Sequence, residues 1–253
     1  MKLQLIRNAT LRLQYAGVEL LIDPMLSEAG SSPPIINTAN DRRNPLVPLP
    51  AAYETDVLPD AVFVTHLHND HWDEAARKAI PHTTPILCQP GDEGAIAESG
   101  FGNVTPIVDT ASFQGIAIRR FGGQHGTGDI GKMLGPVSGF LLQAEGEPSI
   151  YIAGDTIWCS EVEDALDGYH PDITVVNAGG ARFVEGDPII MDAADVASVC
   201  RHAPYTKVVA AHMDAINHCY TTRAGLRKEL ESEGLLNQVL IPEDGEWLEL
   251  SAE

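Results

Sequence analysis

The chain has 253 residues, of which 44% are hydrophobic and 21% charged, a composition typical of a soluble globular protein. Its 36 acidic residues outnumber the 16 lysines and arginines, giving a formal charge of −20 that disfavours nucleic acid and anionic lipid as partners. No apolar run approaches the length of a membrane-spanning helix, and we expect no secretion by a signal peptide, because residues 1–6 open directly into strand-like alternation.

The four cysteines are scattered, without a Cys-x-x-Cys pair, which is typical of reduced thiols rather than of a disulfide framework. Together with the expectation of no signal peptide, this pattern predicts a cytoplasmic protein. No linker or low-complexity segment divides the chain, so we expect a single domain over residues 1–253.

The chain begins with three short runs that predict a meander of strands, at residues 3–6, 10–15 and 18–22. Asp23 and Pro24 end the third strand, and a simple turn is the role that we assign to Asp23.

The segment from Ser27 to Pro50 shows no hydrophobic periodicity and contains five prolines. An irregular segment of this length in a compact domain is usually a lid, a binding loop or disorder. Because it precedes the histidine-rich stretch described next, we expect it to be a lid over the functional site. Arg42 or Arg43 can then meet an anionic substrate, although both also fit the pattern of solvated loop charges.

The most distinctive stretch carries four side chains of the kind that bind metals: His66, His68, Asp70 and His71. Residues 61–64 predict a buried strand before it, and residues 73–80 predict a helix after it. In extended backbone His66 and His68 point to one side, whereas the other two follow the bend. Imidazoles combined with a carboxylate suit a zinc-like ion, and two diverging pairs suggest two ions.

Strands and helices alternate through the rest of the chain, which predicts sheets covered by helices. The expected strands are residues 85–88, 104–108, 116–121, 137–143, 149–153, 172–176, 207–211, 239–241 and 247–250. The expected helices are residues 92–99, 159–166, 193–202 and 222–233.

Further candidate ligands follow strands in this second part: His125 lies in a glycine-rich loop, and Asp155 and His212 each end a strand. A carboxylate at the end of a buried strand costs free energy unless it is paired or ligated. The alternative role of Asp155 is the N-cap of the following helix. Small residues at 177–182 would let the backbone approach the floor of the site.

The motif His66-x-His68-x-Asp70-His71 resembles the signature of the metallo-β-lactamase superfamily, and the later candidates follow in that family's order. The resemblance implies an α/β fold, specifically a four-layer αββα sandwich of two mixed β-sheets with metals at one edge. It also implies a complete set of metal ligands: His66, His68 and His125 for one ion, Asp70, His71 and His212 for the other, and Asp155 as a shared bridge.

Within the superfamily, Gly154-Asp155-Thr156 and residues 212–218 are most similar to the ascorbate-6-phosphate lactonase-like branch. Exported zinc β-lactamases carry a cysteine where Asp155 stands. Diiron oxidoreductases of this fold usually carry a glutamate at the position of His68. Asp155 and His68 therefore point to a hydrolase that belongs to neither of those two branches.

The implied cofactors are two divalent ions, zinc first, with manganese or iron as alternatives. The implied reaction is hydrolysis of a small ester, lactone or phosphoester by a metal-bridging hydroxide. Asp70 is then both ligand and proton acceptor, and His218 is an oxyanion stabiliser or general acid, or else only a local backbone contact. A nuclease acting on RNA is disfavoured by the charge, and a non-catalytic binding protein by the complete ligand set.

Overall fold

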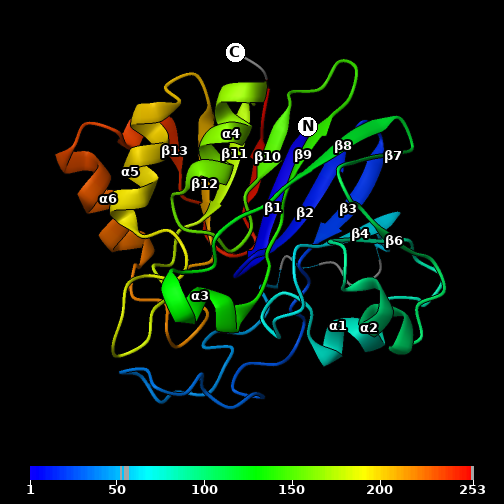
Figure 1. The fold of residues 1–253 in the computed structure, drawn as a ribbon, viewed down its shortest axis with the longest axis horizontal. Helices are drawn as coiled ribbons and strands as arrows, with labels where there is room; N and C mark the ends of the chain where they lie inside the picture. The colour runs from blue at the N-terminus through cyan, green and yellow to red at the C-terminus, as the bar shows by residue number, and fades with distance from the viewer. Residues whose placement is uncertain (52, 54–56, 252–253) are drawn as a thin grey trace.

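In the computed structural model, which describes residues 1–51, 53 and 57–251, two β-sheets face each other and helices cover both outer faces (Figure 1). Within these described residues, each sheet has seven strands. In each of them, four strands run antiparallel to their neighbours and the remaining three extend the sheet in parallel. This arrangement confirms the predicted αββα sandwich.

The first sheet has the strand order β14-β1-β2-β3-β4-β5-β6. Its strands are β1 (Lys2–Arg7), β2 (Thr10–Tyr15), β3 (Val18–Ile22), β4 (Ala61–Val64), β5 (Ile86–Cys88), β6 (Val104–Pro106) and β14 (Trp247–Glu249). Helices α1 (Glu74–Ala79) and α2 (Glu93–Glu98) lie on its outer face. The carboxylate of Asp73 accepts a hydrogen bond from the backbone of Ala76 and so fixes the start of α1 directly after the histidine-rich turn.

The second sheet has the order β13-β12-β11-β10-β9-β8-β7. Its strands are β7 (Thr110–Phe113), β8 (Ile116–Phe121), β9 (Gly139–Gln143), β10 (Ile150–Ile152), β11 (Ile173–Asn177), β12 (Lys207–Ala211) and β13 (Val239–Leu240). The remaining helices are α3 (Gly128–Leu134), α4 (Ser160–Tyr169), α5 (Ala193–His202), α6 (Arg223–Ser232) and a 3-10 turn at Leu236–Gln238. Helices α4, α5 and α6 pack on the outer face of this sheet.

Three apolar layers hold the sandwich together. The largest lies between the sheets, where the rings of Phe63 and Phe140 meet with their centroids 5.5 Å apart. The other two lie between each sheet and its helices. Burial of this apolar area is the main force that stabilises the fold, and it leaves the loops at one end of the sheets free to carry polar side chains.

Strand β7, helix α3 and the 3-10 turn at Leu236–Gln238 were not predicted from the sequence. Strand β7 is an edge strand whose side chains alternate between exposed and half-buried, and its small polar residues give no strong strand signal. Helix α3 contains two glycines, which are poor helix formers, and the apolar residues against which it packs, among them Ile189 and Phe183, are distant in sequence. None of the helices in the described part of the chain has the length and apolar character needed to span a bilayer.

Candidate metal centre

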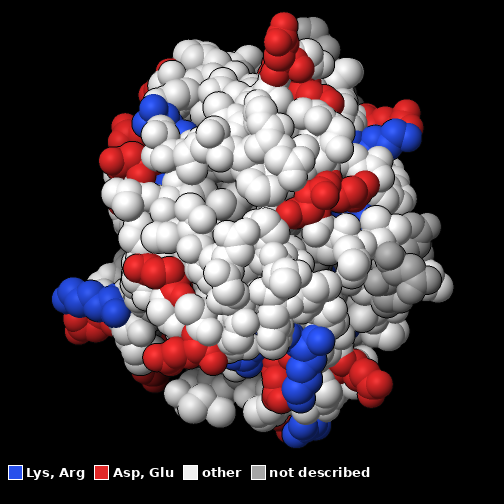
Figure 2. Space-filling model, turned by 90° about the vertical axis from the view of Figure 1, so that its right-hand side faces the viewer, with Lys and Arg blue, Asp and Glu red and all other residues white. Residues whose placement is uncertain are grey.

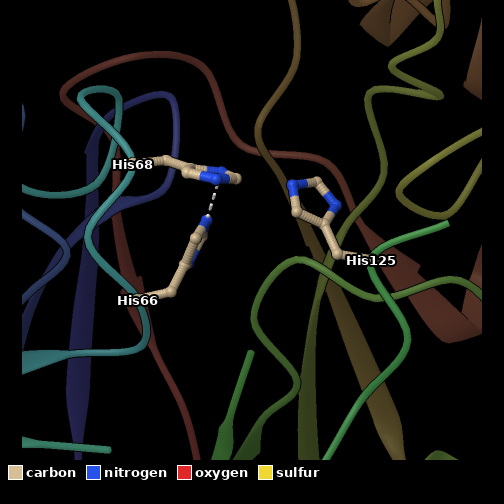
Figure 3. A group of neighbouring side chains, drawn as sticks. All are labelled: His66, His68 and His125. Carbon is tan, nitrogen blue, oxygen red and sulfur yellow. Dashed lines mark hydrogen bonds between the residues drawn. The ribbon is translucent and has the colours of Figure 1, made fainter. Parts of the chain in front are cut away.

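The candidate ligands converge at the end of the sandwich where the parallel strands β4, β10, β11 and β12 finish. The turn after β4 carries His66, His68, Asp70 and His71, whereas Asp155 and His212 follow β10 and β12. His125 comes from the loop between β8 and α3 and faces His66 and His68 across the site (Figure 3). The structure thus brings together all seven side chains that the sequence nominated.

One group of donors consists of His66, His68 and His125, whose ligand atoms lie within 4.8 Å of one another. Nε2 of His66 and Nδ1 of His68 are 3.0 Å apart, the contact drawn in Figure 3. The three imidazoles direct ring nitrogens to a common point, which is the arrangement that a zinc-like ion needs from three neutral histidines.

The second group consists of Asp70, His71, Asp155 and His212, again with ligand atoms within 4.8 Å of one another. Nε2 of His212 lies 3.2 Å from Oδ2 of Asp70, and Nε2 of His71 lies 3.1 Å from Oδ2 of Asp155. Both carboxylates therefore face imidazoles that are almost completely inaccessible to solvent.

Asp155 lies between the two groups. Its Oδ2 is 3.8 Å from Nε2 of His66 and 3.7 Å from Nε2 of His125, while its Oδ1 is 3.7 Å from Nε2 of His212. The alternative role of Asp155 as a helix cap is wrong, because the N-cap of α4 is Cys159. Nδ2 of Asn177, at the end of β11, donates to Oδ1 of Asp155 over 2.7 Å, a support that the sequence did not reveal.

Asp23 has a larger role than the turn that we assigned to it. Its Oδ2 lies 2.8 Å from Nδ1 of His71 and accepts the hydroxyl of Thr65, and its Oδ1 accepts the backbone N–H of Thr65. The hydroxyl of Thr65 in turn lies 3.0 Å from Nδ1 of His66. One buried carboxylate thus orients a ligand from each group, as is usual for histidines that bind metals.

The ligands His125 and His212 also have partners for their second ring nitrogen. Nδ1 of His125 lies 2.8 Å from the carbonyl oxygen of Ile189, and Nδ1 of His212 lies 3.5 Å from Sγ of Cys219. A partner on Nδ1 leaves the Nε2 lone pair for a metal. The sequence around His125 gives no indication of its contact with Ile189, because Ile189 is distant along the chain.

The electrostatics of the cluster favour bound positive charge. Burial lowers the pKa of His66 well below its ordinary value. Burial also acts to lower the pKa of His71, but the carboxylates of Asp155, Asp23 and Asp70 overcome this effect and raise it to about 10. A buried set of acidic and imidazole donors that stabilises a cation in this way fits divalent metal ions.

A pocket of about 330 Å³ opens directly from the metal ligands. Its wall includes several residues of the segment from Ser27 to Pro50, together with Phe183, Ile189 and Ile216 from the second half of the chain. Among the described residues, no lysine or arginine lines it. The guanidinium of Arg43 instead donates to the carbonyl oxygens of Gly30 and Ser31.

His218 lies in the wall of this pocket and is only 7% exposed. Its Nδ1 is buried and has no hydrogen-bond partner among the described residues. Burial lowers the pKa of His218 from its ordinary value of 6.5 to about 4, so the imidazole is neutral at pH 7. A neutral imidazole suits hydrogen bonding to a substrate better than it suits a general acid at that pH.

The fold and the buried histidine–aspartate cluster define the class of metal-binding αββα hydrolases. The family model of the beta-lactamase superfamily domain matches residues 19–213. The chain is also 36% identical over 251 residues to UPF0173 protein YddR of Bacillus subtilis, covering 97% of this chain and 98% of that protein. It therefore belongs to the β-lactamase superfamily, among the metal-dependent hydrolases of metallo-β-lactamase fold.

Two solved structures are similar over their whole length. An isothiocyanate hydrolase from gut bacteria of Delia radicum is 40% identical, with a TM-score of 0.94 and 100% of both chains covered. A possible metal-dependent hydrolase from Veillonella parvula is 36% identical, with a TM-score of 0.95 and 99% of both chains covered.

Proposed function

We propose that this protein is a binuclear metal hydrolase that acts on a small, uncharged ester, lactone or related electrophile. The observation that carries the proposal is the position of Asp155, whose Oδ2 lies within 3.8 Å of ring nitrogens from both donor groups. A single ion needs only one such group, and a carboxylate between two groups suits a bridge between two ions.

The donors would hold the two ions as the sequence assigned them: His66, His68 and His125 for one, Asp70, His71 and His212 for the other, and Asp155 for both. Two such ions supply a water of lowered pKa and polarise the substrate oxygen. Asp70 faces the pocket and accepts the proton of the attacking water. The neutral His218 donates a hydrogen bond to the oxygen on which negative charge develops.

The five histidines and two aspartates make zinc our first choice of metal, with manganese or iron as alternatives. The absence of lysine and arginine from the described pocket wall favours an uncharged substrate over a phosphoester. It supports a lactonase-like or esterase-like activity rather than the anionic substrate that Arg42 or Arg43 suggested.

A second candidate substrate is an isothiocyanate, because a full-length structural relative with 40% identity is described as an isothiocyanate hydrolase. In this reaction water adds to the central carbon of R–N=C=S and forms a thiocarbamic acid. The carbon–nitrogen bond then breaks, the nitrogen takes up the proton, and the products are an amine and carbonyl sulfide. The apolar side chains of Phe183, Ile189 and Ile216 suit the hydrocarbon substituent of such a substrate.

The charge distribution supports a small molecule rather than RNA as the partner. On the face drawn in Figure 2, the basic side chains are few and lie beside acidic ones. A phosphate backbone binds to continuous basic surface, and the formal charge of −20 repels it. We also propose a cytoplasmic, single-domain protein, in line with the expectations from the sequence.

The test is a hydrolysis panel with metal-reconstituted protein and the variant Asp155→Ala. We expect turnover of a lactone, an activated ester or an aryl isothiocyanate, and a loss of roughly 10²-fold or more in kcat together with one metal equivalent in the variant. Asp167→Ala, which removes an exposed carboxylate of α4 that pairs with His202, is the matched control. Full activity of Asp155→Ala, or turnover restricted to RNA, would contradict the proposal.

A further inference from the structure

The segment from Ser27 to Pro50 is fastened at both of its ends by one buried arginine. Nη2 of Arg7 donates to the carbonyl oxygens of Met25 and Ser27, and its Nη1 donates to that of Val47. The arginine side chain is fully buried. The ends of the segment therefore have a fixed separation on the surface of the first sheet.

The middle of the segment is held by the side chain of Asn217, which is 1% exposed. Its Oδ1 accepts the backbone N–H of Ile35 over 2.9 Å. Its Nδ2 donates to the carbonyl oxygen of Asn40 over 2.6 Å and to the hydroxyl of Thr38 over 2.8 Å. A single amide thus supplies hydrogen bonds to three positions of a segment that has no regular secondary structure of its own.

Asn217 also pairs with Asn44 on the returning arm of the segment. Nδ2 of Asn44 donates to Oδ1 of Asn217 over 2.8 Å, and Oδ1 of Asn44 accepts the backbone N–H of Asn217 over 2.9 Å. Asn44 is itself joined to Ser32 by two backbone hydrogen bonds. The two arms of the segment and the loop after β12 therefore meet at one buried pair of amides.

The pair formed by Asn44 and Asn217 lies beside the substrate pocket, and residues next to each asparagine line that pocket. Asn44 and its sequence neighbour Pro45 line the pocket, as do Pro34 and Ile35 on the opposite arm. The residue that follows Asn217 is His218, which also lines the pocket. The side chain of Asn217 thus fixes the apolar wall and the position of His218 at the same time.

We propose that Asn217 is a positioning residue that determines substrate specificity, by holding residues 32–45 as a fixed wall against which the apolar part of the substrate packs. The inference deepens the proposed hydrolase function and rests on it. The segment then selects ligands by the size of their apolar substituent, whereas the metal ligands bind the reacting group regardless of its size. Loss of the Asn217 side chain weakens the selection and leaves the metals in place.

The test measures ligand binding without requiring turnover. Acetohydroxamate and octanohydroxamate bind metals through the same headgroup and differ only in the length of the apolar chain. For Asn217→Ala we expect the preference for octanohydroxamate over acetohydroxamate to fall by roughly tenfold at unchanged metal content, the scale of a few lost hydrogen bonds. Hydrogen exchange of the Ile35 amide should accelerate by a similar factor, because its acceptor is removed.

Asn103→Ala, at an exposed asparagine before β6, is the matched control and should change neither quantity. Asn44→Ala removes the other amide of the pair but leaves the acceptor of the Ile35 amide in place; it should lower the hydroxamate preference, and so it carries the binding test if Asn217→Ala does not fold. The proposal is overturned if exchange at Ile35 is unaltered, or if exchange accelerates while the hydroxamate preference stays at the wild-type value. A panel without any turnover would refute the hydrolase function and leave this binding comparison intact.

Discussion

At the scale of single residues, the buried carboxylate of Asp23 is the clearest example of a function that depends on tertiary contacts. Its three hydrogen bonds to Thr65 and His71 orient ligands from both donor groups. We expect Asp23→Asn to weaken metal binding by roughly 10- to 100-fold, because the amide keeps one acceptor oxygen and its NH2 group then faces donors, either the backbone N–H of Thr65 or the Thr65 hydroxyl and His71 Nδ1. Metal retention during dialysis against a graded chelator series measures this loss.

The substitution is well matched to the site. Asp23 has a φ of 46°, a backbone conformation that asparagine tolerates as readily as aspartate. The backbone conformation and the side-chain volume are therefore preserved. Metal retention equal to that of the unmodified protein would show that Asp23 only shapes the turn.

His218 predicts a pH dependence whose sign follows from burial. Its pKa falls from 6.5 to about 4 on folding, so the unfolded chain binds more protons between these values. The contribution to stability is complete above pH 6.5 and is lost as the pH falls through this window. At pH 5 the loss amounts to roughly 2 kcal/mol. We expect His218→Asn to flatten the dependence of the free energy of unfolding on pH between 7 and 5.

The control for this measurement is His170→Asn. His170 is exposed and ends α4 in a left-handed conformation that asparagine also adopts. Denaturant unfolding at pH 7 and pH 5 gives the two free energies for each protein. If the free energies of unfolding at pH 7 and pH 5 differ by the same amount in His218→Asn as in the unmodified protein, folding does not bury the His218 imidazole in its neutral form. Metal content should be unaltered, since His218 belongs to neither donor group.

At the scale of elements, the close approach of two loops sets the position of His212. A Cβ atom on Gly179, after β11, would lie 2.1 Å from the carbonyl oxygen of His212 and 2.9 Å from Sγ of Cys219. A backbone oxygen cannot move aside as the end of a flexible side chain can. We therefore expect Gly179→Ala to displace the loop after β12, with loss of the second metal and a destabilisation of roughly 1–3 kcal/mol.

Gly168→Ala is the matched control, because no atom lies within 4 Å of the added Cβ atom. Gly168 is inside α4, where alanine should raise the free energy of unfolding by about 0.5–1 kcal/mol. Metal analysis and thermal unfolding of both variants distinguish the two sites. A Gly179→Ala protein that keeps both metals would show that the loop adapts without cost.

The predicted helices and strands agree with the observed ones wherever a local pattern of apolar residues defines the element. Strands β4, β10 and β12 each contain a short apolar run that predicts a strand. The polar residues after β10 and β12 meet because these parallel strands end at one edge of the second sheet, and those after β4 join them from the first sheet, which faces it. Helix α3 was missed because its glycines mask it and its packing partners Phe183 and Ile189 are distant in sequence. Local pattern carries periodicity, whereas contacts between distant segments leave no trace in a single sequence.

The same limit explains what the sequence said about residues 27–50. The lack of periodicity predicted a loop over the site, and the structure places part of that loop in the pocket wall. The sequence did not reveal how the loop is held, because its anchors Arg7 and Asn217 lie outside it. Arg7 belongs to no recognisable motif, and the motif at residues 212–218 does not indicate what the side chain of Asn217 contacts; only the folded chain shows that each residue makes several hydrogen bonds to one segment.

At the scale of the whole molecule, a formal charge of −20 is combined with a buried cluster that requires cations. The acidic surface attracts divalent ions and repels anionic polymers over distances comparable to the Debye length. The sandwich supplies a rigid frame, since the ligands come from loops that connect strands of both sheets. Folding and metal binding are therefore coupled, because the unfolded chain cannot bring these donors together.

Two metals per chain are the final expectation, motivated by seven converging donors in two groups that share Asp155. Elemental analysis of protein purified without chelator should approach two equivalents, and removal of the ions should lower the melting temperature. Ligand binding stabilises the native state by about 4 kcal/mol at a free concentration 1,000 times the Kd, so the shift should grow with added zinc. Asp155→Ala should reduce the content toward one equivalent. A reproducible content near zero, with no uptake of zinc or manganese and no shift in melting temperature, would contradict both the metal centre and the hydrolase that depends on it.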